Sequence, residues 1–253
     1  MKMKRNAALF LAVLMLFSAV FSTGAAAASS SGGFKYRRIA STNNAAIMSV
    51  EEGSDIEKAQ ELTIPAVING LRVTIIDAGA FANNTVWKKI NLPDSVDTIG
   101  SSAFYGLSSL TEIKIPKKVV DVGSSAFANC TSLKSVDFSA STLTQLPMNM
   151  FSGCTSLNDV ILPSGLNTID EYAFNGCSSL KRIYVPASTS NINKTAFTKN
   201  ADITFYGVGG STVKYFAYQN GYKFVPLEER QDRSALNTIL VSSDYKLKED
   251  LSA

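Results

Sequence analysis

The sequence predicts a mainly β repeat solenoid, in which the parallel strands of successive coils stack on one another between an N-terminal β-hairpin cap and a C-terminal helical cap. Three observations predict this fold: an Ala-Phe pair recurs at a nearly constant spacing, apolar residues alternate ahead of a proline in most copies, and both ends depart from the repeat. A lone coil buries too little apolar surface to offset its ordering entropy. The coils are therefore expected to be stable only as a stack.

The repeat is most visible in its phenylalanines, which are separated by 23, 23, 24, 23 and 23 residues. They are expected to form one buried column, whose members are Phe81, Phe104, Phe127, Phe151, Phe174 and Phe197. The extra residue in the third interval falls within residues 139–142, which are small and mostly polar. Such residues place the insertion in a loop and leave the core phase unchanged.

Each copy carries one strand with a buried face. Ile113 and Ile115 show the alternation, and Pro116, which lacks an amide hydrogen, ends the strand. The repeated part spans residues 76–210, with a period of about 23 residues.

The two ends are expected to cap the array. Asn69-Gly70 between apolar residues predicts a β-hairpin within an N-terminal linker and β cap at residues 29–75. Residues 211–226 predict a cap that begins with a helix, with Ser211 or Thr212 as N-cap and Asn220-Gly221 as its end. Residues 227–253 carry no repeat and are interpreted as a tail.

The first 28 residues predict a signal peptide. Lys2, Lys4 and Arg5 precede a short apolar region and a run of small residues ending at about Ala28. Cleavage there leaves no apolar segment long enough to span a membrane. It also removes three cations and no acid, so the net charge falls from +3 to zero. A neutral chain has no general field that would attract nucleic acid or anionic lipid, so neither is expected as a partner.

The motif of the repeat resembles that of a known family. The run Ala-Phe-x-x-Cys-x-Ser-Leu-x-x-Val at 126–136, with its Leu-Pro and Ile-Gly steps, is similar to the BspA-like leucine-rich repeats (LRR), over roughly residues 34–226. The resemblance implies a leucine-rich repeat array in a bacterial cell-surface or secreted protein, several relatives of which act as adhesins. No wall-sorting motif follows the array, so the means of attachment to a surface is left open.

Catalysis is not expected, because the sequence contains no histidine, no phosphate-binding loop and no nucleophile elbow. Cys130, Cys154 and Cys177 all lie three residues after a repeat Phe, which favours a buried packing column over a disulfide or a metal site. The chain is therefore interpreted as a non-enzyme with no cofactor and no metal.

The exposed strand positions are the remaining candidates for function. Three opposite-charge pairs on neighbouring strands predict a self-satisfied ladder: Lys89 with Glu112, Lys114 with Asp137, and Asp159 with Arg182. Beyond this ladder the candidate ligand-binding residues are Tyr184, Arg182, Ile161 and Tyr206, since Tyr and Arg are enriched in binding interfaces.

Two functions fit these expectations. The first is a secreted or cell-surface binding or adhesion module that recognises an extracellular protein or glycan through its solenoid face. The alternative is an extracellular scaffold or envelope-assembly component that uses the array as a spacer. The sequence identifies neither the ligand nor the oligomeric state.

Overall fold

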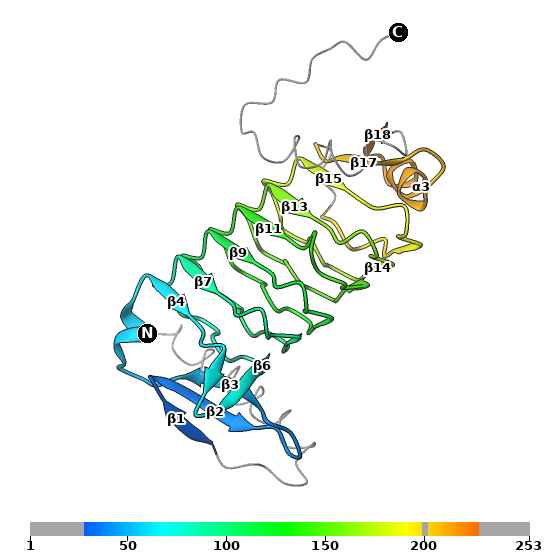
Figure 1. Cartoon of the computed structure of the whole chain (residues 1–253). Coiled ribbons are helices and arrows are strands. Elements are labelled where there is room, and N and C mark those ends of the chain that lie inside the picture. The colour runs from blue at the N-terminus through cyan, green and yellow to red at the C-terminus, as the bar shows by residue number, and fades with distance from the viewer. Residues whose placement is uncertain (1–27, 199–201, 228–253) are drawn as a thin grey trace, which may run out of the picture.

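The computed structural model describes residues 28–198 and 202–227, and shows a β-solenoid of about seven turns (Figure 1). The predicted signal peptide and tail lie outside the described residues, apart from Ala28 and Leu227 at their edges. The predicted parallel stacking of coils is confirmed, with neighbouring coils paired strand to strand in register.

One side of the solenoid is a five-stranded parallel sheet, whose middle residues are buried while the flanking residues point outward. Its strands are β4 (Glu61–Thr63), β7 (Lys89–Asn91), β9 (Glu112–Lys114), β11 (Ser135–Asp137) and β13 (Asp159–Ile161). The next coil continues this side with β15 (Arg182–Tyr184), beside β13 in Figure 1. The outward side chains of these six strands are called the strand face below.

A second column of two-residue strands forms another side of each coil. It comprises β8 (Thr98–Ile99), β10 (Asp121–Val122), β12 (Gln145–Leu146), β14 (Thr168–Ile169) and β16 (Asn191–Ile192). Gly123, which follows β10, leaves no room for a side chain, because a Cβ there would lie 2.3 Å from the backbone nitrogen of Ser101 in the preceding coil. The Ile-Gly step of the repeat therefore lets two coils approach closely.

The predicted phenylalanine column runs through the core as a stack of parallel rings. Ring centroids of neighbours along the column lie 5.0 to 5.6 Å apart. Backbone bonds run beside the rings: the amide of Phe104 donates to Ala126 at 2.9 Å, and that of Phe127 donates to Met150 at 3.0 Å. Each coil is thus held to the next by apolar contact and by hydrogen bonds.

The three cysteines form a second core column, as expected from their phase, and all are free and buried. The thiol of Cys130 donates to the carbonyl oxygen of Phe104 at 3.1 Å, and the other two thiols repeat this contact one coil further on. Burial raises the pKa of Cys177 to about 12, and the neighbouring Cys130 thiol together with burial holds the pKa of Cys154 well above its usual range. These protonated thiols serve packing.

The N-terminal end is covered by a small mixed assembly of strands, in which β3 and β6 pair in parallel. It comprises β1 (Ser29–Ser31), β2 (Phe34–Arg38) and β3 (Asn44–Val50), with β5 (Val67–Ile68) and β6 (Leu71–Ile76) forming the predicted hairpin. Asn69 and Gly70 at its turn both have positive φ, 46° and 75°. Helix α2 (Asp55–Lys58), which the sequence reading missed, receives a 2.8 Å hydrogen bond at the Ile56 carbonyl from the Trp87 indole.

The C-terminal end is closed by helix α3 (Thr212–Gln219) between strands β17 (Thr204–Val208) and β18 (Lys223–Leu227). The predicted helix limits are confirmed, since Ser211 is the N-cap and Asn220 the C-cap. Phe205, Phe216 and Tyr222 pack against one another, and the first two also pack against the last ring of the phenylalanine column. The apolar end of the stack is therefore covered by aromatic side chains.

Candidate functional site on the strand face

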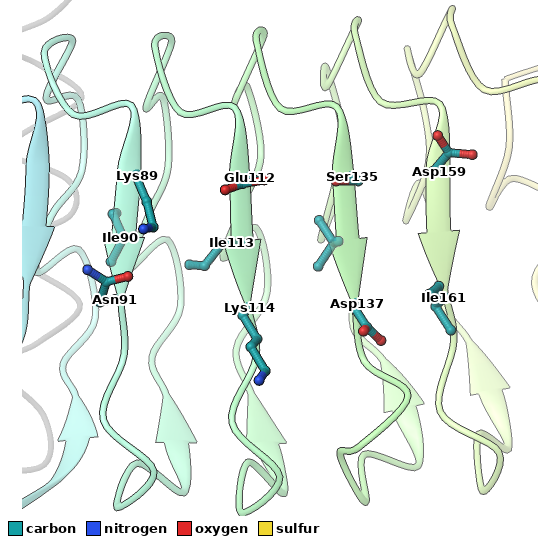
Figure 2. Close-up of a pocket in the computed structure, with 11 residues that line it drawn as sticks. Lys89, Ile90, Asn91, Glu112, Ile113, Lys114, Ser135, Asp137, Asp159 and Ile161 are labelled. Carbon is teal, nitrogen blue, oxygen red and sulfur yellow. The ribbon is translucent and has the colours of Figure 1, made fainter. Parts of the chain in front are cut away.

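The strand face carries a shallow groove of about 350 Å³ across β7, β9, β11 and β13 (Figure 2). The repeat creates it, because each coil contributes the same two outward positions at the same height. Charged and polar side chains dominate these positions. The polar ones are Lys89, Asn91, Glu112, Lys114, Ser135, Asp137 and Asp159, and the apolar one is Ile161.

The N-terminal end of the groove is fixed by contacts to Glu61 on β4. The Lys89 ammonium lies 3.4 Å from the Glu61 carboxylate, and the Asn91 amide donates to the same carboxylate at 2.6 Å and to Thr63 at 3.0 Å. The Asn91 hydrogen bond, followed by the charge of Lys89, lowers the pKa of Glu61. Glu61, Lys89, Asn91 and Thr63 therefore interact with one another through an ion pair and hydrogen bonds.

The other end is fixed by an ion pair between strands. The guanidinium of Arg182 lies 3.7 Å from the carboxylate of Asp159, so this predicted pair is confirmed. The predicted interaction of Lys89 with Glu112 is wrong, because Lys89 instead pairs with Glu61 in the preceding coil. The predicted pair of Lys114 with Asp137 is wrong as well, because the described residues form no ion pair between them; Asp137 instead accepts a 2.7 Å hydrogen bond from the backbone of Ser139 in the inserted loop.

Between these ends the centre of the groove is left unsatisfied. Within residues 28–198 and 202–227, the side chains of Glu112, Lys114 and Ser135 make no hydrogen bond or ion pair. A carboxylate, an ammonium and a hydroxyl therefore face the same hollow with their hydrogen-bonding capacity free. Such a surface can bind a polar ligand through several directional contacts.

The four residues that the sequence singled out do not form one exposed cluster. Ile161 is half-buried and lines the groove, Arg182 is half-buried against Asp159, and Tyr206 is half-buried two strands beyond Ile161. Tyr184 is only 8% exposed, so the expectation that it projects freely from the strand face is wrong. It lies directly opposite Tyr206 on the paired strand β17, at the strand spacing of about 4.8 Å, so Tyr206 covers it on that side.

The groove offers binding chemistry rather than activated groups. Among the described residues no group of three or more His, Cys, Asp or Glu side chains is placed to hold a metal ion. The Ser135 hydroxyl has no base within hydrogen-bonding distance in the same part of the chain, although a serine nucleophile needs one. No helix within the described ranges is long and apolar enough to span a bilayer.

The charged residues of the groove were expected to belong to the self-satisfied ladder, whereas Ile161 was expected to be a ligand-binding residue. The signal that could have separated them was Glu61, one strand position before Leu62, which gives Lys89 an acid on its N-terminal side. Once Lys89 is paired there, Glu112 has no cation left in its own column. Because Lys89 pairs with the acid of the preceding coil and not with Glu112, the centre of the groove has no internal ion pair.

Three solved structures of other bacterial proteins are similar to this chain. A leucine-rich cell surface protein from Faecalibacterium prausnitzii is 28% identical, over 74% of this chain and 56% of its own, with a TM-score of 0.56. The T. pallidum leucine rich repeat protein is 25% identical over 79% of this chain and 99% of its own, with a TM-score of 0.58. A leucine-rich repeat protein from Eubacterium ventriosum is 28% identical over 69% of this chain and 50% of its own, with a TM-score of 0.53.

The chain thus spans only about half the length of two of these three similar structures. A comparison with curated protein sequences gives no match. The model of the BspA type leucine rich repeat region matches six copies over residues 74–204, which is more than half of the chain. The chain therefore belongs to the BspA-type leucine-rich repeat family.

Proposed function

We propose that this chain is a secreted or cell-surface bacterial protein that recognises an extracellular protein or glycan through the strand face, without catalysing a reaction. The family and the similarity to a leucine-rich cell surface protein from F. prausnitzii support the location. The predicted signal peptide agrees with it. The absence of histidine from the sequence supports a binding role rather than a catalytic one.

The observation that carries the proposal is the unsatisfied centre of the groove. Both ends of the strand face are neutralised internally, by Glu61 at one end and by the Asp159–Arg182 pair at the other. Glu112 and Lys114 lie on one strand between those ends, and they have no partner within the described residues. A ligand that offers both a donor and an acceptor would satisfy them together.

Ile161 gives the polar groove one apolar wall at its C-terminal side. Arg182, held against Asp159, borders that wall, and Tyr206 lies one coil beyond the buried Tyr184. The proposed site therefore extends from Lys114 and Glu112 toward Ile161. Arg182 and Tyr206 form its edge, and the largely covered Tyr184 lies beside Tyr206 on the paired strand.

The test begins with the mature protein on a printed glycan array and on a panel of purified extracellular proteins, and the tightest-binding probe is carried forward. The variants Glu112→Ala and Lys114→Ala should each weaken that probe by about fivefold or more, because each removes a charge-assisted contact worth about 1 kcal/mol or more. The matched controls are Asp121→Ala and Lys134→Ala, which remove exposed charges outside the groove.

Equal affinities for the groove variants and the wild type would contradict the proposal. If instead removal of residues 228–253 abolished binding, the spacer alternative would account for the data better. Circular dichroism of every variant checks that the solenoid is intact.

A further inference from the structure

A second hollow, separate from the strand face, lies where the β5–β6 hairpin stands beside two stacked turns. Its volume is about 770 Å³. Its walls are contributed by the hairpin, by the start of β3 and by the turns that follow β7 and β9. The lining residues are Asn43, Ala66, Val67, Gly70, Arg72, Pro93, Asp94, Ser95, Lys117 and Lys118.

The repeat explains two of these walls. In the second coil the amide of Val96 donates to the carbonyl of Pro93 at 3.1 Å, and in the third coil Val119 donates to Pro116 at the same distance. The two turns therefore have the same shape and stack. In the first coil the hairpin takes the place of this turn and is five residues longer, so it projects where the later coils have only a short loop.

The hairpin wall is held in place by its backbone. The amide of Arg72 donates to the carbonyl of Asn43 at 3.0 Å, and the amide of Val73 donates to Ala66 at 2.9 Å. Arg72 also pairs in register with Asn44 on β3 and with Val67 on β5. Its exposed side chain therefore extends from a fixed position on the rim.

Three cations converge on this hollow against one carboxylate. Arg72, Lys117 and Lys118 are all exposed, and none forms a hydrogen bond or ion pair with the described part of the chain. The acid is Asp94, which lies farther than ion-pair distance from each of them. The corresponding turn positions of later coils, 164–165 and 187–188, carry no charge, so the basic character belongs to this place alone.

One further polar side chain in the wall of the hollow has no hydrogen-bond partner. Ser95 is only 8% exposed, and its hydroxyl has no hydrogen-bond partner. In the same phase of a later coil, the hydroxyl of Ser188 donates to the carbonyl of Leu166 at 2.6 Å. Buried hydroxyls without a partner are uncommon in proteins, and this one lines the hollow in which the cations gather.

We propose that this hollow binds an acidic polysaccharide through its sulfate or carboxylate groups. Lysine recognises such groups as a point charge, and two adjacent lysines opposite an arginine match a chain that carries several anions. The lining holds Arg72 but no Trp, Tyr or Phe, so it lacks the aromatic anchors of a typical protein interface. The predicted mature chain is neutral overall, so attraction of a polyanion would depend on this local cluster.

The experiment uses four immobilised probes: dextran sulfate, polygalacturonate, neutral dextran and poly-glutamate. The mature protein should bind dextran sulfate, polygalacturonate or both at low salt and should not bind neutral dextran. The double variant Lys117→Gln/Lys118→Gln should lose about tenfold or more of this affinity, and the loss should shrink as salt is raised. Comparison of the two acidic glycans distinguishes a sulfate from a carboxylate ligand.

The matched control is Lys88→Gln/Lys134→Gln, which removes the same charge from two exposed lysines that line neither hollow. Equal losses in the two double variants would overturn the proposal, because they would show attraction to net charge alone. Tighter binding to poly-glutamate than to either acidic glycan would assign the hollow to an acidic peptide instead. The groove variant Lys114→Ala should retain at least half of the polysaccharide affinity, so this test and that of the strand face can fail separately.

Discussion

Replacement of Phe127 by alanine is the most direct perturbation of the stacked core. The ring is 0% exposed and lies between two others, with centroids 5.3 Å from Phe104 and 5.6 Å from Phe151. A buried Phe→Ala change costs about 3 to 5 kcal/mol. Two lost ring stacks, each worth about 0.5 to 1.5 kcal/mol, place this site in the upper half of that range.

The expected loss in the free energy of unfolding is therefore about 4 to 5 kcal/mol. For a chain of this size, that loss lowers the melting temperature by roughly 8 to 20 °C. Urea unfolding followed by far-UV circular dichroism measures it, and the fluorescence of Trp87, the single tryptophan, reports the N-terminal coils separately. A shift in both signals would show that the damage spreads between coils.

The control is Phe127→Leu, which keeps most of the apolar volume and should cost about 1 to 2 kcal/mol. A loss below about 1 kcal/mol for the alanine variant would refute the reasoning, because it would mean that the ring column does not hold the coils together.

Three other predictions follow from burial and close approach. Tyr184→Ala should cost about 2 to 4 kcal/mol in a thermal melt because its ring is buried, whereas Tyr215→Ala, at a side chain 60% exposed, should change stability by less than about 0.5 kcal/mol; equal effects would contradict the burial. Because the pKa of the Cys177 thiol is raised in the folded state, its contribution to stability is complete below about pH 8.5 and is lost as pH rises toward the folded value, at about 1.4 kcal/mol per pH unit. Urea midpoints at rising alkaline pH should fall less steeply in a Cys177→Ala variant, and thiolate absorbance in the native protein near pH 8.5 would count against this. Gly123→Ala should cost about 1 to 3 kcal/mol in the same urea assay, because the added Cβ meets backbone 2.3 Å away, while Gly165→Ala, with nothing within 4 Å, should be nearly neutral; equal costs would show that the coils are not this close.

The sequence was sufficient to predict the stacked fold because every copy of the repeat carries the same spacing information. A Phe that recurs every 23 or 24 residues, with Ile113 and Val136 equivalent in successive strands, places every coil in register with the next. The hairpin at Asn69-Gly70 and the helix after Ser211 were predictable for a local reason, since each depends on turn or cap chemistry at a few positions.

The candidate site was less predictable, because strand alternation gives the direction of a side chain and not the identity of its partner. Lys89 has an acid on either side in its column; the sequence offers Glu61 as one of the two, and the structure shows that Lys89 pairs with it. Alternation likewise points Tyr184 outward but does not show how far its neighbours cover it. The basic hollow depends on where the hairpin lies relative to Lys117, which no local pattern records.

The measurement that tests the strand-face proposal most directly is carboxyl labelling of the mature protein, with and without the tightest-binding probe, read by mass spectrometry. Glu112 and Asp137 line the groove, while Asp121 lies in the second strand column and serves as an internal reference. A ligand in the groove should slow the labelling of Glu112 and Asp137 and leave Asp121 unchanged. Unchanged labelling of both groove carboxylates at a saturating probe concentration would contradict the account.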